Sequence, residues 1–334
     1  MGAFDWPTVL PVVFMALMGL SMLAYVVLDG YDLGVGLLLP RADDAGKDTM
    51  IASIGPFWDA NETWLVLGVG ILLIAFPKAH GMVLTALYLP VALMLVGLIL
   101  RGVAFDFRVK AQAQHKPLWN LAFFAGSGLA AVNQGWMLGR YITGFAEGWA
   151  YTAFAGVIAL LLPAAYVLLG AGWLIMKTEG ELQPQAVRWA RIAWPPVVLG
   201  MGLISLATPV VSETVRERWF SLPAFVLLLP IPLLTLAALA AARVSLNSKQ
   251  VLERLCWVPF VMVVAVFVLG AVGLAYSLFP YVVIDRLTLW EAASATEALA
   301  VILIGCAITV PTIAVYTVYS YRVFWGKAEP LNYA

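Results

Sequence analysis

The sequence predicts an all-α, polytopic membrane protein with nine transmembrane helices. Of its 334 residues, 63% are hydrophobic and only 11% are charged. Several apolar runs reach about 20 residues, which is the length that a helix needs to cross a bilayer. No stretch between these runs is long enough to form a soluble domain. We therefore expect one integral membrane domain over residues 1–334, arranged as two four-helix bundles with one peripheral helix.

Each expected span is an apolar run that ends at charged or turn-forming residues. The segment from Met1 to Val9 holds no Lys or Arg, which predicts a retained first span and not a cleaved signal. In chain order, the nine spans are expected at about Pro7 to Asp29 or beyond, Ser53 to Phe76, Gly81 to Ala104, Leu118 to Leu138, Tyr151 to Met176, Val187 to Val210, Leu222 to Ala242, Leu252 to Leu278 and Ala295 to Trp325.

The basic residues are divided unequally between the two sides that this topology defines. Fourteen of the 19 Lys and Arg fall on one side of the membrane and five on the other. Loops on the cytoplasmic side usually carry the excess of Lys and Arg. Nine spans with this division predict an N-terminus outside and a C-terminus in the cytoplasm.

The segment Gly55-Pro56-Phe57-Trp58-Asp59-Ala60-Asn61-Glu62-Thr63-Trp64 places two carboxylates in an otherwise apolar span. Acids within a membrane are costly, and by default they indicate a path for protons or ions. Asp59 and Glu62 are three residues apart and share one helix face. Asp29 and Asp106 fall at the cytoplasmic ends of their own spans, so we expect them to cluster with Asp59 while Glu62 points inward. We interpret these four acids as a cytoplasmic proton inlet, in which Asp29 and Asp106 feed Asp59 and the path leads on towards Glu62.

A static role is the alternative for these acids, because they could pair with Arg101 and Arg108 or cap helix ends. For Asp32, which lies in a glycine-rich segment, a structural role is the favoured interpretation. Asn133 and Gln134 are polar residues within the fourth span, and we expect them to hydrogen-bond another helix.

The composition argues against several other classes of protein. Lys and Arg balance Asp and Glu at 19 each, and no basic block of the kind that binds nucleic acid is present. The cysteines Cys256 and Cys306 lie in apolar contexts 50 residues apart and are expected to be free thiols. His80 and His115 are expected at opposite faces of the membrane. The sequence therefore predicts no metal site in this chain, and any redox metal is expected in another subunit.

Three motifs resemble subunit II of bacterial cytochrome bd-type quinol oxidases, and the cyanide-insensitive branch is the most similar. They are Leu28-Asp29-Gly30-Tyr31-Asp32-Leu33-Gly34-Val35-Gly36, the Gly55 to Leu65 segment that contains Asp59, and Arg101-Gly102-Val103-Ala104-Phe105-Asp106-Phe107-Arg108. They follow the family's order and intervals, and they cover the first 110 residues. One departure is Ala60, where many members of the family carry Gly.

The resemblance implies functional positions in this chain. The family's proton-pathway acids match Asp29, Asp59 and Asp106. Its tryptophan in the second motif matches Trp64, which together with Trp58 marks a proposed oxygen route. These assignments rest on the resemblance and not on the composition or spacing of the residues.

The resemblance also implies cofactors and partners. A haem-bearing subunit I is expected to carry the b-type and d-type haems, to oxidise quinol and to reduce oxygen to water in the bacterial inner membrane. This chain is then expected to ligate no haem, to form an obligate heterodimer with subunit I, and to contact membrane lipids. A small single-helix accessory subunit, and a quinone or lipid bound to this chain, are compatible with the resemblance.

Two other functions compete with this reading. A proton-coupled secondary transporter would bind substrate and proton at midplane acids, but such proteins usually place polar groups and broken helices in both halves. Here the acids crowd into the first third of the chain. A purely structural membrane partner, with its acids in static pairs, is the other alternative.

Overall fold

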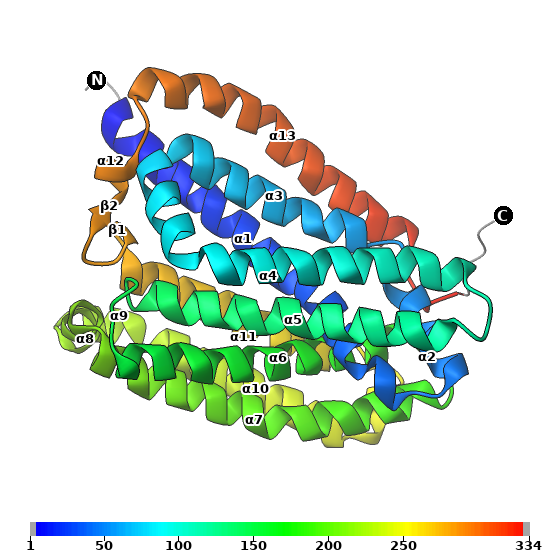
Figure 1. Ribbon diagram of the computed structural model, residues 1–334. Coiled ribbons are helices and arrows are strands. Elements are labelled where there is room, and N and C mark those ends of the chain that lie inside the picture. The colour runs from blue at the N-terminus through cyan, green and yellow to red at the C-terminus, as the bar shows by residue number, and fades with distance from the viewer. Residues whose placement is uncertain (1–4, 330–334) are drawn as a thin grey trace.

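Long helices that run roughly side by side form the body of the protein, as Figure 1 shows. The structure is a computed structural model that describes residues 5–329. The elements are α1 (Trp6–Leu38), η1 (Leu39–Arg41), α2 (Asp44–Ile54), α3 (Trp58–Ala75), α4 (Pro77–Lys110), α5 (Lys116–Ile142), α6 (Trp149–Lys177), α7 (Leu182–Val211), α8 (Glu213–Phe220), α9 (Ala224–Leu228), α10 (Pro230–Asn247), η2 (Lys249–Leu252), α11 (Val258–Leu278), β1 (Tyr281–Val283), β2 (Leu287–Thr288), α12 (Leu289–Ala292) and α13 (Thr296–Val323).

The two ends of the bundle carry different elements. The α2 end carries α2 and the last turn of α13, whereas the hairpin end carries the antiparallel β1–β2 hairpin, α8 and α12. The N-terminus lies at the hairpin end and the C-terminus at the α2 end (Figure 1).

The prediction of a helical, polytopic membrane protein is confirmed. Within residues 5–329, eight helical segments are long and apolar enough to cross a bilayer. The helix α5 is not among them, although it has 27 residues and lies beside α4 and α6. Its polar side chains, which include Asn133 and Gln134, lower its hydropathy. Nine membrane crossings therefore remain a prediction, as does the grouping into two four-helix bundles.

The expected second span is broken where the sequence reads Gly55-Pro56-Phe57. Proline has no N–H to donate and its ring crowds the preceding turn, so a helix ladder is interrupted there. The short helix α2 ends before this break, and its N-terminus is capped by the Asp43 carboxylate, which accepts a hydrogen bond of 2.8 Å from the Gly46 N–H. We expected Asp59 about 9 Å inside a span that begins at Ser53. The structure instead places Asp59 in the first turn of α3.

Glycines allow α1 to pack closely against α6. A Cβ atom added at Gly34 would overlap the carbonyl group of Tyr166, and one added at Gly170 would lie 2.6 Å from the Gly34 carbonyl carbon. Small residues at such crossings let two backbones approach, which is the usual way that helices associate in lipid. This contact fixes α1 in the interior, where its buried face includes Asp29 and Asp32.

The last helix, α13, lies on the outside of the bundle (Figure 1). Of its 28 residues, only Leu299 and Ser320 are buried. The segment that follows it is tied to the end of α6. Lys177 Nζ donates to the Phe324 carbonyl at 2.7 Å, and the Ala328 N–H donates to the Lys177 carbonyl at 2.7 Å. The C-terminal end of α13 is therefore held at the α2 end although most of the helix faces outward.

Candidate functional site

Three charged side chains from α1, α3 and α4 meet inside the bundle and form what we call the acid–arginine cluster: Asp29, Glu62 and Arg101. The Arg101 Nη2 atom lies 2.5 Å from Asp29 Oδ1 and also forms an ion pair with Glu62 Oε1. The side chains of Asp29 and Arg101 are each 1% exposed, whereas that of Glu62 is 28% exposed. Glu62 is thus the member of the cluster that reaches toward the surface.

The local sequence explains why these three residues meet. Asp29 lies nine residues before the end of α1 and Arg101 nine residues before the end of α4, so both lie about 13.5 Å from the α2 end of their helices. Glu62 is four residues into α3, which begins at the same end. A guanidinium at this depth can engage both carboxylates, and an isolated buried charge would cost several kcal/mol.

A second buried acid, Asp32, lies one turn beyond Asp29 on α1. Asn61 Nδ2 donates a hydrogen bond to Asp32 Oδ2 at 2.8 Å and another to the Tyr31 hydroxyl at 2.9 Å. The hydroxyl groups of Tyr31 and Tyr321 lie 2.5 Å apart, and Tyr321 also donates to Asn61 Oδ1 at 3.2 Å. Side chains of α1, α3 and α13 therefore join around Asp32.

A third set of polar side chains continues from Asp29 toward α5 and α6. The Tyr166 hydroxyl donates to Gln134 Oε1 at 2.6 Å, and Gln134 Nε2 donates to the Tyr25 hydroxyl at 2.7 Å. Tyr25 lies one helical turn before Asp29 on α1. The expectation that Gln134 bonds another helix is confirmed. Asn133, in contrast, donates to the Leu129 carbonyl of its own helix.

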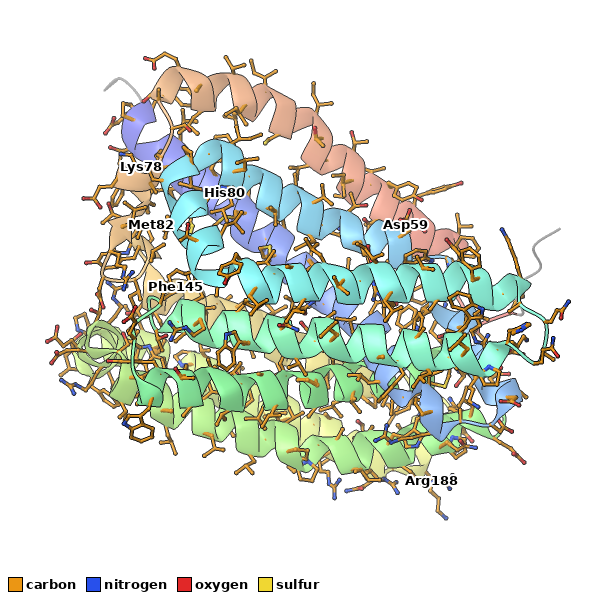
Figure 2. All side chains as sticks on the ribbon, in the orientation of Figure 1. Asp59, Lys78, His80, Met82, Phe145 and Arg188 are labelled. Atoms are coloured by element: carbon orange, nitrogen blue, oxygen red, sulfur yellow. The ribbon has the colours of Figure 1, made fainter. Side chains whose placement is uncertain are left out.

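Asp59 and Asp106 lie on the surface and not in the cluster. Both side chains are exposed, and within residues 5–329 neither forms an ion pair. Figure 2 shows Asp59 on α3 toward its α2 end. The structure therefore brings together Asp29 and Glu62 of the four predicted acids, and leaves Asp59 and Asp106 exposed to the surroundings of the chain near the α2 end.

The two arginines expected to support the acids have different partners. Arg101 lies between Asp29 and Glu62, as described above. Arg108 is buried, but its Nη2 atom pairs with Asp48 at 2.8 Å and its Nε donates to Asn120 Oδ1 at 2.5 Å. Asp48 belongs to α2, so Arg108 holds α2 against α4 and α5 and contacts none of the four predicted acids.

The two tryptophans of the second motif differ in burial. Trp64 is 7% exposed, and its indole N–H has no hydrogen-bond partner in the described part of the chain. Trp58 is half-buried, and the centre of its ring lies 5.1 Å from that of Phe105. Both belong to α3, which places Trp64 deeper in the bundle than Trp58 and about 9 Å along the helix from it.

The described residues contain no group of three or more His, Cys, Asp or Glu side chains that could hold a metal ion. His80 lies in the first turn of α4 and His115 directly precedes α5, so the length of α4 separates them. A single haem ligated by two histidines would need both side chains to reach that same haem. These two positions do not fit that requirement.

Sequence reasoning missed part of this arrangement. It did not select Asn61, Tyr25, Tyr31 or Tyr321, and it assigned Asp32 a structural role. The signals available were the position of Asn61 directly before Glu62 and the one-turn spacing between Asp29 and Asp32. Tyr321 gave no signal, because its contact with Asn61 spans 260 residues of sequence.

Known proteins similar to this chain belong to the family that the three motifs resemble, and the similarity extends along almost the whole chain. It is 26% identical to a protein from Escherichia coli described as "Cytochrome bd-I ubiquinol oxidase subunit 2", covering 96% of this chain and 95% of the relative. It is also 26% identical to the "Cytochrome bd ubiquinol oxidase subunit 2" of Bacillus subtilis, covering 95% and 97%. The "Probable cytochrome oxidase subunit 2" of Haemophilus influenzae is 26% identical over 92% of both chains.

A solved structure shares the fold. One chain of the bd oxidase from Geobacillus thermodenitrificans superposes with a TM-score of 0.77 over 96% of this chain and 100% of that chain, at 17% sequence identity. The sequence profile described as "Cytochrome bd terminal oxidase subunit II" matches residues 10–324. Because this match covers nearly the whole sequence, the chain belongs to the cytochrome bd terminal oxidase subunit II family.

Proposed function

We propose that this chain is subunit II of a respiratory quinol:oxygen oxidoreductase in a bacterial inner membrane. In this role it supports a haem-bearing subunit I and lines a proton path from the cytoplasm, so that reduction of oxygen to water contributes to the proton-motive force. Family membership over residues 10–324 supports the respiratory part of the proposal. The observation that carries the proton path is the acid–arginine cluster, which contains ionisable side chains deep inside an apolar bundle.

The geometry suggests an order for the acids. Asp59 and Asp106 are exposed near the α2 end, where they can exchange protons with their surroundings. Glu62 lies one turn beyond Asp59 on α3 and is partly exposed, and Arg101 links it to the buried Asp29. Intramembrane carboxylates of this kind serve as proton relays in pumps and transporters. We therefore order the path from Asp59 and Asp106 through Glu62 to Asp29, which differs from the order expected from the sequence because Asp29 is buried.

The haems belong to subunit I in this proposal. The separation of His80 from His115 along α4 is the feature of this chain that supports it. Quinol is oxidised by the complex, and this chain supplies helix packing and proton-carrying side chains. Trp64 and Trp58 lie beside an oxygen route in this proposal. The exposed faces of the outer helices accommodate a quinone or lipid, or a small accessory subunit.

The sequence predicts that fourteen of the 19 Lys and Arg residues lie on one side of the membrane. All fourteen lie toward the α2 end of the helices or in the connections there. By the rule that cytoplasmic loops are the more basic, this end faces the cytoplasm. A reporter fused after residue 334 is then active in the cytoplasm, and a tag before Met1 is accessible from outside. The reverse pattern contradicts the orientation and the count of nine spans.

The decisive experiment is purification in mild detergent through a tag on this chain, followed by a visible absorption spectrum. The expected result is a complex with a larger helical subunit, b-type and d-type haem absorbance, and quinol oxidase activity. Stoichiometric haem bound to the isolated chain contradicts the placement of the haems. Purification without haem or partner, together with proton-coupled accumulation of a solute, supports the transporter instead.

A further inference from the structure

The carboxyl group of Asp32 has an incomplete set of partners. It is fully buried, and Asn61 donates to its Oδ2 atom. Its Oδ1 atom has no hydrogen-bond partner within residues 5–329. An ionised carboxylate accepts several hydrogen bonds, and one left buried without them is costly. The surroundings of Asp32 therefore supply fewer donors than a buried carboxylate needs.

The charges around Asp32 do not balance when every acid is ionised. Arg101 is the guanidinium that faces it, and this group already contacts Asp29 and Glu62. Asp29 and Glu62 face Asp32 as well. The other polar side chains around it in the described part of the chain are uncharged: Asn61 from α3, Tyr31 from α1 and Tyr321 from α13. Three carboxyl groups thus share one guanidinium. Full ionisation would leave a net charge of −2 inside the bundle.

A proton on Asp32 reduces this excess from −2 to −1 without the set of ligands that a metal ion needs. No three acidic, histidine or cysteine side chains of the described segment are arranged to hold a metal. The guanidinium of Arg101 also occupies the space between Asp29 and Glu62, the two acids nearest to it. A neutral carboxylic acid needs no cation, and its O–H group is a donor that can engage a neighbouring oxygen.

We propose that Asp32 is a neutral carboxylic acid in the resting protein and is a further proton-carrying residue of the path. It is loaded from the α2 end through the Tyr31–Tyr321 hydroxyl pair and discharges to Asp29. This inference rests on the proposed function, because it adds a second branch to the proton path that leads through Asp59 and Glu62. The branch begins at the last turn of α13, which covers this part of the bundle.

The transfer of a proton from Asp32 to Asp29 conserves atoms and charge. The O–H bond of Asp32 breaks and its proton forms a new O–H bond on the carboxylate of Asp29, which lies three residues earlier on α1. Asp32 is left as a carboxylate, and the Asn61 amide that donates to it stabilises the charge. A proton that enters beside the two tyrosine hydroxyls, which lie 2.5 Å apart and are connected to Asp32 by the Asn61 side chain, restores the acid. No oxidant or reductant takes part.

The experiment uses the complete complex and records infrared spectra of its carboxyl groups in H₂O and D₂O. A protonated acid has a C=O stretching band that an ionised carboxylate lacks, so Asp32→Asn is expected to remove one such band. Asp44→Asn is the matched control, because Asp44 is an exposed carboxylate paired with Lys47 at 2.8 Å. We expect no carboxylic acid band to be lost in the control. An unchanged acid band in an assembled Asp32→Asn complex overturns the proposal.

Turnover tests whether the proton is used. Asp32→Asn is expected to lower quinol oxidase turnover at least about tenfold, and Asp32→Glu to restore part of it. Loss of the band with parental turnover overturns the assignment to the path. If Asp32→Asn fails to assemble, Tyr321→Phe replaces it, since this variant keeps the carboxyl group and removes one hydroxyl. Tyr321→Phe should slow H–D exchange of the acid band, and parental exchange overturns the branch.

The proposed function and this inference fail in different ways. Parental turnover in Asp59→Asn, combined with slow turnover in Asp32→Asn, contradicts proton uptake through Asp59 and supports the Asp32 branch. Slow turnover in Asp59→Asn with an unchanged band in Asp32→Asn supports the main path and overturns the branch.

Discussion

Tyr321, in the last turn of α13, donates a hydrogen bond of 3.2 Å to the Oδ1 atom of Asn61, in the first turn of α3, across 260 residues of sequence. The same Asn61 side chain donates to the buried Asp32. A helix that otherwise lies on the outside of the bundle is therefore connected to the polar interior by one hydroxyl group. Asn61 therefore couples the final helix to the interior acid Asp32.

Removal of Arg101 should destabilise the protein severely. In Arg101→Gln, the buried Asp29 loses its guanidinium partner, and breaking a buried ion pair in this way costs about 3–5 kcal/mol. We expect a much lower yield of folded protein in detergent and a lower midpoint of thermal unfolding. Arg188→Gln is the control, because Figure 2 shows Arg188 on α7 pointing away from the bundle. Its effect should stay within about 0.5 kcal/mol.

A double variant separates charge from packing. Adding Asp29→Asn to Arg101→Gln removes the unpaired carboxylate, so the combined loss of stability should be smaller than the sum of the two single losses. Additive losses, or a stable Arg101→Gln protein, would show that the ion pair does not stabilise the fold.

Asp59→Asn should impair turnover without impairing assembly. Asp59 is exposed and unpaired among the described residues, so the amide is expected to change stability by no more than about 0.5 kcal/mol. Asn cannot exchange a proton, and we expect quinol oxidase turnover to fall at least about tenfold, which is close to 1.4 kcal/mol on the barrier. Asp59→Glu should retain more activity. Full assembly of Asp59→Asn with parental turnover would remove Asp59 from the proton path.

Gly34→Ala should disrupt the contact between α1 and α6. The added methyl group would overlap the Tyr166 carbonyl, which belongs to a helix backbone and cannot move aside as a side chain can. Overpacking usually costs about 1–3 kcal/mol, and a backbone collision belongs at the upper end. Gly19→Ala is the matched control on the same helix, since nothing lies within 4 Å of its added Cβ. Equal unfolding midpoints for the two variants would contradict the close approach.

The hairpin end should lose local stability in acid. Glu291 accepts hydrogen bonds from the Thr288 hydroxyl at 2.7 Å and the Thr288 N–H at 2.9 Å, and these bonds lower the pKa of its carboxyl group. A lowered pKa in the folded state means that the stabilisation is complete above the unfolded value of about 4.3 and is lost as the pH falls through the folded value.

Hydrogen-exchange protection of residues 281–292 measures this effect. Protection in the parental protein should fall as the pH decreases below about 4. Glu291→Gln keeps an acceptor but cannot titrate, so its protection should not vary with pH over the same range. Identical pH profiles for the two proteins would show that another group is responsible.

The sequence was sufficient to predict a helical, polytopic membrane protein, because long apolar runs are typical of helices buried in lipid. It was less informative at Ser53–Phe57, where a short helix at the end of the bundle stops at Ile54, just before Pro56. Apolar residues continue across this break, so the predicted span from Ser53 joins the last two residues of α2 to α3. The helix α5 shows the opposite difficulty, because polar side chains that bond neighbouring helices reduce its apolar character.

The candidate site was predicted only in part, for a related reason. Asp29, Glu62 and Arg101 were identified because charge inside an apolar span is conspicuous. Which face of a helix turns inward depends on its neighbours, and the sequence did not show that Asp32 is buried while Asp59 is exposed.

The spacing between Asp29 and Arg101 also has a consequence for biosynthesis. Arg101 follows Asp29 by 72 residues, and at about 5–20 residues per second the ribosome needs roughly 4–14 s to deliver it. During this interval α1 is available for insertion while the guanidinium that will pair with its acid does not yet exist. An unpaired Asp at the centre of a membrane helix costs about 2.5–3.5 kcal/mol, and Asp29 lies on the α2 side of the centre of α1. Synonymous codons that slow translation between these two positions therefore prolong the stage at which Asp29 has no guanidinium partner, without changing the protein that results.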